Sequence, residues 1–350
     1  MQVGGLFALD DCLRRLDQAG DPLDKLVKAL NWEGLEAIIA PLKNEESNKG
    51  GRPAWSQLII VKCMILQAYY NLSDESCEYQ VNDRLSFKRF LGLNVADKAP
   101  DAKTLWHYRE KIKYKQIDKA IFDWFETELN KAGYTAEKGQ IVDASFVPTH
   151  KPSGKHTKQL QAEIPLTPAQ MRQIDTDATF TKKGKATYHG YKDHCNVDVK
   201  HKFIRAQSIS TASLHDSQEF EALLQPAPQI SAIDAGDAAA PVAHEDARVF
   251  ADSAYRSAKA EAMLIEQKFL SEVHERAYRG KPLTDEQKAE NKRKSKIRAR
   301  VEHVFGHVET AMGGFMIHTI GLARAKVKIT FKNIAYNFQR FVFLQAKAMG

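Results

Sequence analysis

The chain has 350 residues, 43% hydrophobic and 27% charged, a balance that excludes a disordered protein. No apolar run approaches the roughly 18–20 residues that a membrane-spanning helix needs, and the acidic start MQVGGLFALDDCL does not fit a secretory signal. The four cysteines have no short CxxC spacing, which argues against a zinc ribbon, and the net charge of +7 favours a polyanionic partner only modestly.

Residues 1–132 carry apolar residues at helical spacing, first in LDKLVKALNWEGLEAII and again in WSQLIIVKCMILQAYYNL. Ser73 and Ser86 are predicted N-caps of two short helices in this region. In a later helix we expect Trp106 and Tyr108 to belong to the core rather than to stack on bases. The pattern predicts an all-α N-terminal domain, compatible with a helix-turn-helix module or with any small bundle.

From residue 133 the pattern changes to alternating strands and helices, which predicts an α/β domain over 133–350 with a mixed sheet flanked by helices. Residues 150–190 are basic and polar, and we predict a long arm or loop there. The Pro/Ala-rich residues 226–246 predict a surface insertion. Strands are predicted at 139–147, 194–200, 203–210, 247–255 and 269–275, and helices at 213–224, at 256–269, through Glu302, and at 323–348.

Two aspartates follow apolar residues, where an acid is costly to place. Asp143 follows Gln140-Ile141-Val142, and Asp252 follows Val249-Phe250-Ala251. Ligands collect at strand ends in open α/β sheets, and paired carboxylates can hold the Mg²⁺ ions that phosphoryl transfer uses. Each aspartate alone is explained as well by a cap or a turn, so the spacing leaves both interpretations open.

Glu302 is a third candidate, next to a helical stripe formed by Ile297, Val301 and Val304. Arg298 lies one turn before it, and an exposed i,i+4 ion pair, worth on the order of a few tenths of a kcal/mol, explains the spacing by itself. The stretch from Arg276 to Arg300 is strongly basic. In isolation such a stretch is typical of a solvated helix face; its position beside these acids favours contact with a polyanionic partner instead.

Several blocks of the chain resemble bacterial insertion-sequence transposases of the DDE class, above all the group named after insertion sequence five. VDASF, FADSAYR and RARVEHVFG resemble the three active-site blocks of these enzymes. The resemblance covers about residues 25–345. It also includes Gly51-Arg52-Pro53, Tyr70-Asn71-Leu72-Ser73-Asp74, Pro100-Asp101 with Tyr108-Arg109, His189-Gly190-Tyr191-Lys192, and Leu214-His215-Asp216.

This resemblance implies an RNase H-like catalytic core in which Asp143, Asp252 and Glu302 hold two Mg²⁺ ions, with Mn²⁺ as a possible substitute. It implies double-stranded DNA as the partner, both the inverted repeats at the element's ends and the target. Two ends must be held together, so we expect a homodimer or a larger assembly. We expect a bacterial cytoplasmic protein with reduced thiols, associated with the nucleoid when bound to DNA.

The expected DNA contacts are basic side chains near these blocks, namely Arg298, Arg300, Lys292, Lys294, Lys296, Lys192, His189 and Arg52. An exposed hairpin is a competing interpretation for His189 and Lys192. His215 and Asp216 are expected beside the metal ligands, although a capping box with Ser213 explains Asp216 equally well.

The chain departs from a Tyr-x₂-Arg-x₃-Glu-x₆-Lys pattern of related transposases, because Ser295 stands in place of the Tyr and Glu309 in place of the Lys. Both departures leave the metal ligand in place. Two alternatives therefore stay open: an inactive, repurposed DNA-binding protein derived from a transposase, and a structure-specific nuclease on the same fold.

Overall fold

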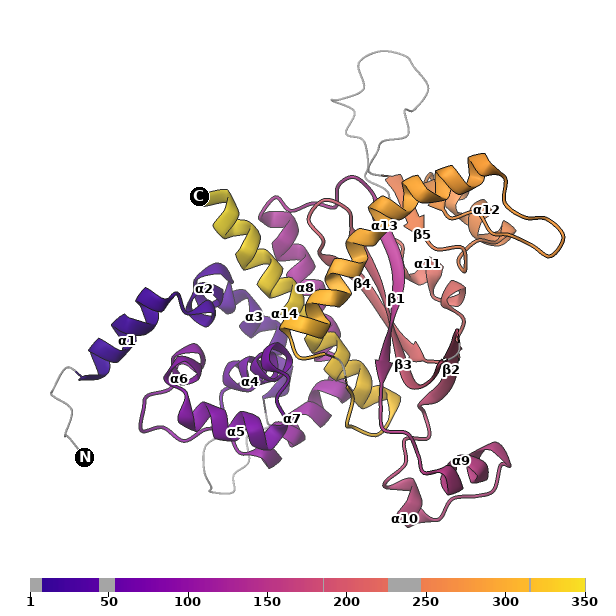
Figure 1. Cartoon of the computed structure of the whole chain (residues 1–350). Coiled ribbons are helices and arrows are strands. Elements are labelled where there is room, and N and C mark those ends of the chain that lie inside the picture. Colours follow the sequence, from indigo (N-terminus) through magenta and orange to yellow (C-terminus); the bar gives the residue numbers. More distant parts are fainter. Residues whose placement is uncertain (1–7, 44–53, 185, 226–246, 315, 350) are drawn as a thin grey trace. The chain divides into compact units, whose positions relative to one another are not determined.

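The computed structural model describes residues 8–43, 54–184, 186–225, 247–314 and 316–349 (Figure 1). The chain forms two compact units, unit 1 from residues 1–128 and 330–350 and unit 2 from residues 129–329. The boundaries fall inside the helices α8 and α14, so they differ from the predicted division at residue 132, which remains a prediction about function. Among the described residues no helix is long and apolar enough to cross a membrane.

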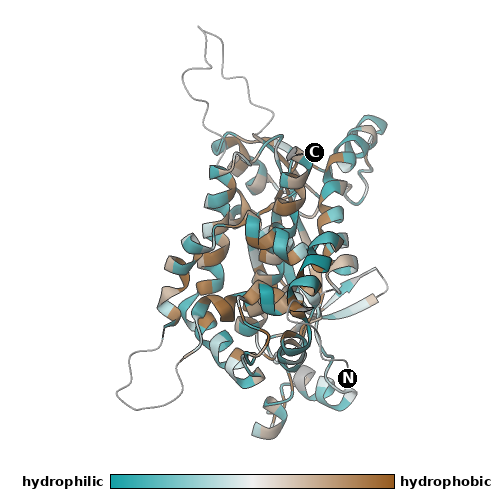
Figure 2. Cartoon of the chain, turned by 90° about the vertical axis from the view of Figure 1, so that its left-hand side faces the viewer, coloured by the Kyte–Doolittle hydropathy of each residue, from teal (hydrophilic) through white to brown (hydrophobic). Residues whose placement is uncertain are grey.

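Unit 1 is helical in its described part, and its helices alternate polar and apolar residues along the chain (Figure 2). Its helices are α1 (Ala8–Ala19), α2 (Pro22–Ala29), α3 (Trp32–Ile39), η1 (Ala40–Leu42), α4 (Gln57–Tyr70), α5 (Asp74–Asp83), α6 (Leu85–Leu91), α7 (Ala102–Lys115), most of α8 (Ile117–Lys131) and the larger part of α14 (Leu322–Met349).

Local capping explains several of these boundaries. Ser73 is the N-cap of α5, as predicted, and its hydroxyl accepts a hydrogen bond from the Ser76 amide at 3.0 Å. Ser86 is not an N-cap, because α6 already begins at Leu85 after the extended Arg84. Trp106 is 50% exposed and was wrongly predicted to be a core residue, whereas Tyr108 is buried as expected.

Two blocks of the sequence resemblance meet inside unit 1 as a buried ion pair. The guanidinium of Arg109 on α7 donates hydrogen bonds to both carboxylate oxygens of Asp74, the first residue of α5. It also donates to the side chain of Gln67 on α4, and Gln67 donates to Asp74 at 2.7 Å. These partners stabilise the packing of α4, α5 and α7, which gives Asp74 and Arg109 a structural explanation.

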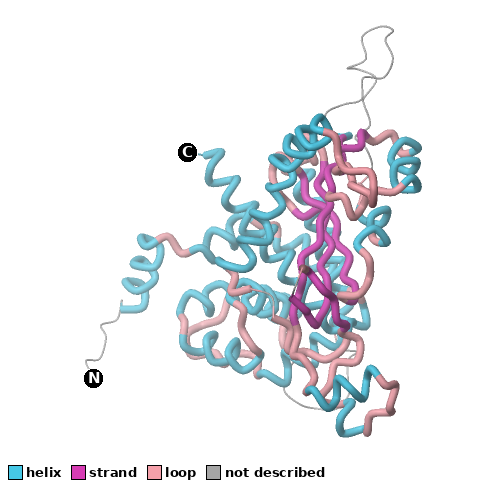
Figure 3. The backbone as a smooth tube through the Cα atoms, turned by 45° about the vertical axis from the view of Figure 1, so that its right-hand side comes forward, coloured by secondary structure: helices cyan, strands magenta, loops and turns pink. Residues whose placement is uncertain are grey.

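Unit 2 is built on one six-stranded mixed sheet, in which the strands lie side by side in the tube view (Figure 3). The order is β2-β3-β1-β5-β6, with β4 paired to β3; β1 is antiparallel to β3 and parallel to β5. The strands are β1 (Gln140–Pro148), β2 (Thr179–Lys183), β3 (Ala186–Asp198), β4 (Ile204–Thr211), β5 (Arg248–Ala251) and β6 (Leu270–Val273), and the helices are α9 (Gly154–Gln161), α10 (Pro168–Met171), η2 (Asp216–Gln218), α11 (Phe220–Leu223), α12 (Ala258–Glu266) and α13 (Asp285–Ala311).

The two faces of this sheet have different neighbours. Val142 packs in a buried cluster with Phe220 and Leu223 of α11 and Leu264 of α12. Successive side chains of a strand point to opposite faces, so Asp143 points away from this cluster, toward α13. Figure 1 shows α13 running beside β1, and α13 packs against both β1 and β5.

The long β3 was underpredicted. It begins at Ala186 rather than at residue 194, and its first half pairs with β2. The predicted arm at 150–190 is therefore not a loop throughout, since it contains α9, α10, β2 and the start of β3. Gly190 permits this arrangement, because a Cβ there would lie 2.2 Å from the carbonyl oxygen of Val147 on β1.

The helix predicted at 213–224 is shorter than expected. It consists of the turn η2 and the short α11, and the N-cap of η2 is His215 rather than Ser213. The predicted insertion at 226–246 and Arg52 lie outside the described residues.

Candidate active site

Asp143 and Asp252 occupy equivalent places on neighbouring parallel strands. Val142 on β1 pairs with Ala251 on β5, and each aspartate is the next residue along its strand direction. Parallel neighbours lie about 4.8 Å apart, and β5 ends at Ala251 while β1 continues. The two aspartates therefore lie next to each other in the chain order of neighbouring strands, at the end of β5.

The electrostatics of Asp143 reflect this position. The pKa of its carboxyl is raised to about 6, mainly by burial and in smaller part by the charge of Asp252, while Arg298 and the amide of Ala144 act in the opposite direction. The Asp252 carboxylate accepts a hydrogen bond from the Ala254 amide at 2.8 Å, which fixes the turn after β5. The charge of Asp252 therefore acts on the carboxyl of Asp143.

Glu302 comes to this site on α13, which starts at a capping box formed by Thr284 and Gln287. Val301 and Val304 are buried, as predicted, and orient the helix. The Glu302 side chain is 64% exposed, and its carboxylate lies 3.8 Å from the guanidinium of Arg298. Arg298 in turn donates a hydrogen bond to Asp143 at 2.6 Å. The arginine thus links the two acids, which lie on different elements.

The donor set suits a hard divalent cation, because it consists of carboxylate oxygens. The carboxylates of Asp143 and Glu302 both face the positively charged guanidinium of Arg298. Within the described ranges, however, no three His, Cys, Asp or Glu side chains are close enough together to hold a metal ion. The carboxylate donors fit such an ion chemically, and in this structure the guanidinium of Arg298 lies between Asp143 and Glu302.

Tyr255 is a site residue that the sequence reasoning did not single out. Its side chain is buried, stacks near Phe220, and its hydroxyl has no hydrogen-bond partner among the described residues. Burial raises the pKa of Tyr255, and Asp143, Asp216 and Asp252 raise it further, so the hydroxyl lies in the field of these acids. Its place in the block FADSAYR was the available signal.

His215 and Asp216 behave differently from each other. Asp216 accepts a hydrogen bond from Lys192 at 2.8 Å and lies 3.9 Å from the buried His194. The charge of Asp216 raises the pKa of Tyr255, as do the charges of Asp143 and Asp252. His215 is exposed, and its ring bonds Ser217 of η2. This contact gives His215 a capping role.

The predicted basic contacts divide by exposure. Lys292 and Lys296 are exposed on α13, and Arg300 donates to the carbonyl of Val199 at 2.7 Å. Lys294 is buried and donates to the carbonyl of Val273. It lies seven residues before Val301, on the same helical stripe, a signal that could have placed it inside. In this conformation Lys294 does not face solvent.

Two residues of the predicted DNA surface lie within the β3 region. His189 is buried, its ring lies 4.5 Å from that of Phe180, and burial lowers its pKa. Lys192 is engaged with Asp216 and the carbonyl of Leu214. Neither side chain is presented to a DNA phosphate in this structure, and the competing interpretation of an exposed hairpin does not hold for the buried His189.

The two departures from the family pattern are visible on α13. The hydroxyl of Ser295 lies 3.4 Å from the ring of His274, in the position where related enzymes carry a tyrosine. Glu309 is exposed, seven residues after Glu302. Neither residue contacts Asp143 or Asp252 through a hydrogen bond, so the arrangement of the acids does not depend on them.

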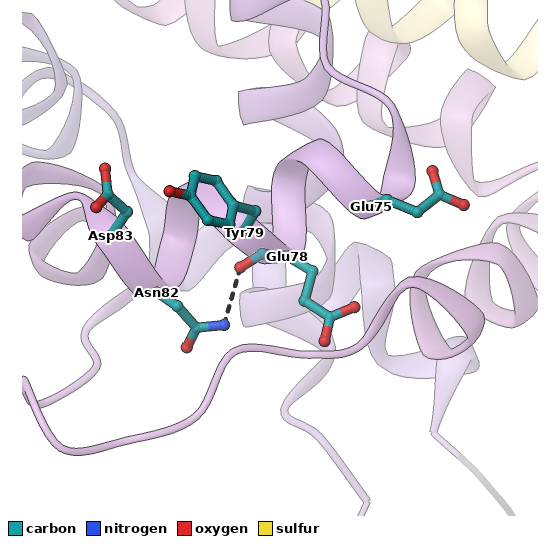
Figure 4. A pocket seen from close by; sticks show the side chains of 5 residues that line it. All are labelled: Glu75, Glu78, Tyr79, Asn82 and Asp83. Carbon is teal, nitrogen blue, oxygen red and sulfur yellow. Dashed lines mark hydrogen bonds between the residues drawn. The ribbon is translucent and has the colours of Figure 1, made fainter.

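A pocket with a volume of about 520 Å³ lies in unit 1 and is lined entirely by α5 (Figure 4). Three of its five lining residues are acidic, and Asn82 donates to the carbonyl of Glu78 at 2.9 Å. This surface repels phosphate, so it is not a candidate for DNA binding. Its lining residues are Glu75, Glu78, Tyr79, Asn82 and Asp83.

Comparisons with known proteins show the family of this chain. The family described as Transposase DDE domain matches residues 134–338, more than half of the chain, and Transposase domain (DUF772) matches residues 11–111. The chain belongs to the DDE transposase family. A cryo-EM structure of the piggyBac transposase synaptic complex with hairpin DNA aligns with a TM-score of 0.47 at 10% identity, covering 94% of this chain and 76% of that one. Family membership rests on the sequence matches and not on this likeness.

Proposed function

We propose that the chain is a DNA transposase of the group named after insertion sequence five, and that residues 133–350 form an RNase H-like nuclease and strand transferase. The observation that carries the proposal is the parallel register of Val142 with Ala251, which places Asp143 beside Asp252. Family membership and the linkage of Glu302 through Arg298 support the same conclusion.

In this proposal Asp143, Asp252 and Glu302 would together hold two Mg²⁺ ions, and Mn²⁺ could replace them. Two such ions supply activation of the attacking oxygen and stabilisation of the leaving oxygen. Water would first attack the phosphorus at the element's end. The bond from phosphorus to the 3′-oxygen breaks, which leaves a 5′-phosphate on the flanking DNA and a protonated 3′-hydroxyl on the element. That hydroxyl then attacks a target phosphate in line, so one phosphodiester bond forms as another breaks.

The proposed DNA path runs along α13, where Lys292 and Lys296 are exposed and Arg300 is partly exposed. The helical region up to residue 132 is proposed to recognise the inverted repeats, mainly through phosphates and a few base edges. Joining requires two ends, which is why an assembly of two or more copies is part of the proposal.

The test is Mg²⁺-dependent joining of a labelled element end to a plasmid by the native chain, Asp252→Asn and Asp285→Asn. Asp285 is a fully exposed acid at the start of α13 and serves as the control. We expect joining by the native and control proteins, and DNA binding without joining by Asp252→Asn. Binding without any cleavage by the native chain would favour the repurposed binder, and cleavage without joining would favour the structure-specific nuclease.

A further inference from the structure

Arg298 occupies the place between two proposed metal ligands. Its Nη1 donates to Asp143 Oδ2 at 2.6 Å, and its Nη2 lies 3.8 Å from Glu302 Oε1. Both Arg298 and Asp143 are largely buried, with side chains 22% and 17% exposed. The guanidinium is therefore partly shielded from water, and it lies between one carboxylate on β1 and one on α13.

Both carboxylate oxygens of Asp143 are already occupied. Oδ1 accepts from the Ala144 amide at 2.9 Å, and Oδ2 accepts from Arg298. A divalent cation that binds Oδ2 would lie next to the Nη1 of Arg298, and repulsion between the two positive charges in this largely buried place favours release of the guanidinium. Arg298 and the ion therefore compete for Asp143.

The arginine is held incompletely. Its Nε is buried and has no hydrogen-bond partner among the described residues, and 3.8 Å to Glu302 is too long for a hydrogen bond. A phosphate would offer the planar guanidinium two parallel hydrogen bonds. Lys292 and Lys296 expose positive charge on the same helix, where that phosphate would arrive.

We propose that Arg298 is a placeholder cation that holds Asp143 and Glu302 in the DNA-free protein and gives up Asp143 to a metal ion when a DNA phosphate binds its guanidinium. This inference rests on the proposed function. It makes DNA binding and metal binding cooperative, and the coupling must be equal in both directions. A purely structural arginine predicts the opposite sign, because its removal would loosen the acids and weaken metal binding.

The test measures Mn²⁺ binding to the full chain by the paramagnetic resonance of free Mn²⁺, without DNA and with a precleaved end duplex that leaves no bond to hydrolyse. Arg298→Gln removes the placeholder. Arg293→Gln removes the same charge from the same helix, where Arg293 pairs with Glu272 and Glu290, and is the matched control. Asp252→Asn gives the background of Mn²⁺ bound elsewhere.

Without DNA, we expect Arg298→Gln to bind Mn²⁺ about tenfold more tightly than the native chain, the size of one charge-assisted hydrogen bond. Arg293→Gln should stay within about twofold of the native value, because Arg293 pairs with Glu272 and Glu290 and not with the proposed metal ligands. The duplex should tighten Mn²⁺ binding about tenfold in the native chain and less than about twofold in Arg298→Gln. Arg298→Lys, which keeps the charge but cannot span both acids, should fall between the native chain and Arg298→Gln.

The placeholder role would be overturned if the folded Arg298→Gln or Arg298→Lys protein bound Mn²⁺ only as tightly as the native chain, or more weakly. The proposed function would survive that result if native Mn²⁺ binding still depends on Asp252. If Asp252→Asn bound Mn²⁺ as tightly as the native chain does, that result would contradict both the placeholder role and the proposed metal site.

Discussion

At the scale of single residues, the environment of one hydroxyl group predicts how its removal changes the free energy of unfolding. Tyr255 is buried beside the acids, and its hydroxyl lacks a partner among the described residues. Tyr255→Phe removes a desolvated polar atom without leaving a cavity, so the free energy of unfolding should be unchanged or rise by about 1 kcal/mol. Equilibrium unfolding in urea measures this.

Tyr191 is the matched control, since its buried hydroxyl donates to Asp175 at 2.6 Å. Tyr191→Phe should lower the free energy of unfolding by about 1.5–3 kcal/mol, because it removes a hydrogen bond to a charged group. Equal losses in both variants would show that the Tyr255 hydroxyl has a partner in solution.

The Asp74–Arg109 pair carries a second prediction at this scale. Asp74→Asn leaves the buried Arg109 without its counter-charge and should cost about 3–5 kcal/mol of stability. The exposed pair of Lys119 and Asp123 on α8 is the control, and Asp123→Asn should cost less than about 1 kcal/mol. Thermal unfolding of the three proteins compares them; similar costs would contradict a buried structural role for Asp74.

At the scale of elements, α13 combines a buried stripe with an exposed basic surface. Lys292 and Lys296 face solvent, whereas Lys294 does not. If both exposed lysines contact phosphates, replacing them with alanine should reduce the slope of log K against log salt by about two. Fluorescence anisotropy with an end duplex at several salt concentrations measures the slope.

Lys259, an exposed lysine on α12, is the control for this measurement. Lys259→Ala should leave the slope unchanged. A slope that is insensitive to Lys292 and Lys296 would move the DNA path away from the exposed surface of α13.

The element scale also shows which parts of the fold were accessible from one sequence. Apolar runs located β1 and β5, and the same runs drew attention to the acids that follow them. The first half of β3 was missed because its residues 186–189 are largely polar, and strand pairing with β2, not hydrophobic patterning, places them in the sheet. Trp106 was wrongly predicted to be buried because it is a large apolar residue. The buried stripe of α7 runs through Leu105 and Arg109, and Trp106 lies outside that stripe.

The site was only partly predictable for a similar reason. The alternation of a strand predicts which face Asp143 occupies, but no local pattern predicts that Arg298, 155 residues later, donates to it. For Lys294 the local signals disagree. Its spacing from Val301 indicates a buried position, whereas its charge indicates an exposed one. The contact between Arg298 and Asp143 depends on how α13 packs against β1. No short segment of the sequence specifies that packing.

At the scale of the whole molecule, buried histidines predict acid sensitivity. His194 is fully buried against Ser210, and burial lowers its pKa, while Lys192 lowers it slightly and Asp216 and Glu219 raise it. The unfolded chain then binds more protons below about pH 6.5, so the contribution of His194 is present above that pH and is lost as the pH falls.

The native chain should therefore lose about 1 kcal/mol more stability than His194→Gln between pH 7.5 and 5.5. Urea unfolding at the two pH values measures the difference. His107→Gln, at an exposed position on α7, is the control and should follow the native chain. Parallel losses in the native chain and His194→Gln would contradict the assignment of this sensitivity to His194.

The central claim is that Asp143, Asp252 and Glu302 form one metal site, and affinity cleavage by iron tests it most directly. Fe²⁺ bound in place of Mg²⁺, with ascorbate and peroxide, cuts the backbone next to the ion. We predict cuts near residues 143, 252 and 302 that excess Mg²⁺ suppresses and that Asp252→Asn abolishes. Cuts confined to other segments, or cuts at these segments that neither Mg²⁺ nor Asp252→Asn affects, would contradict a shared metal site.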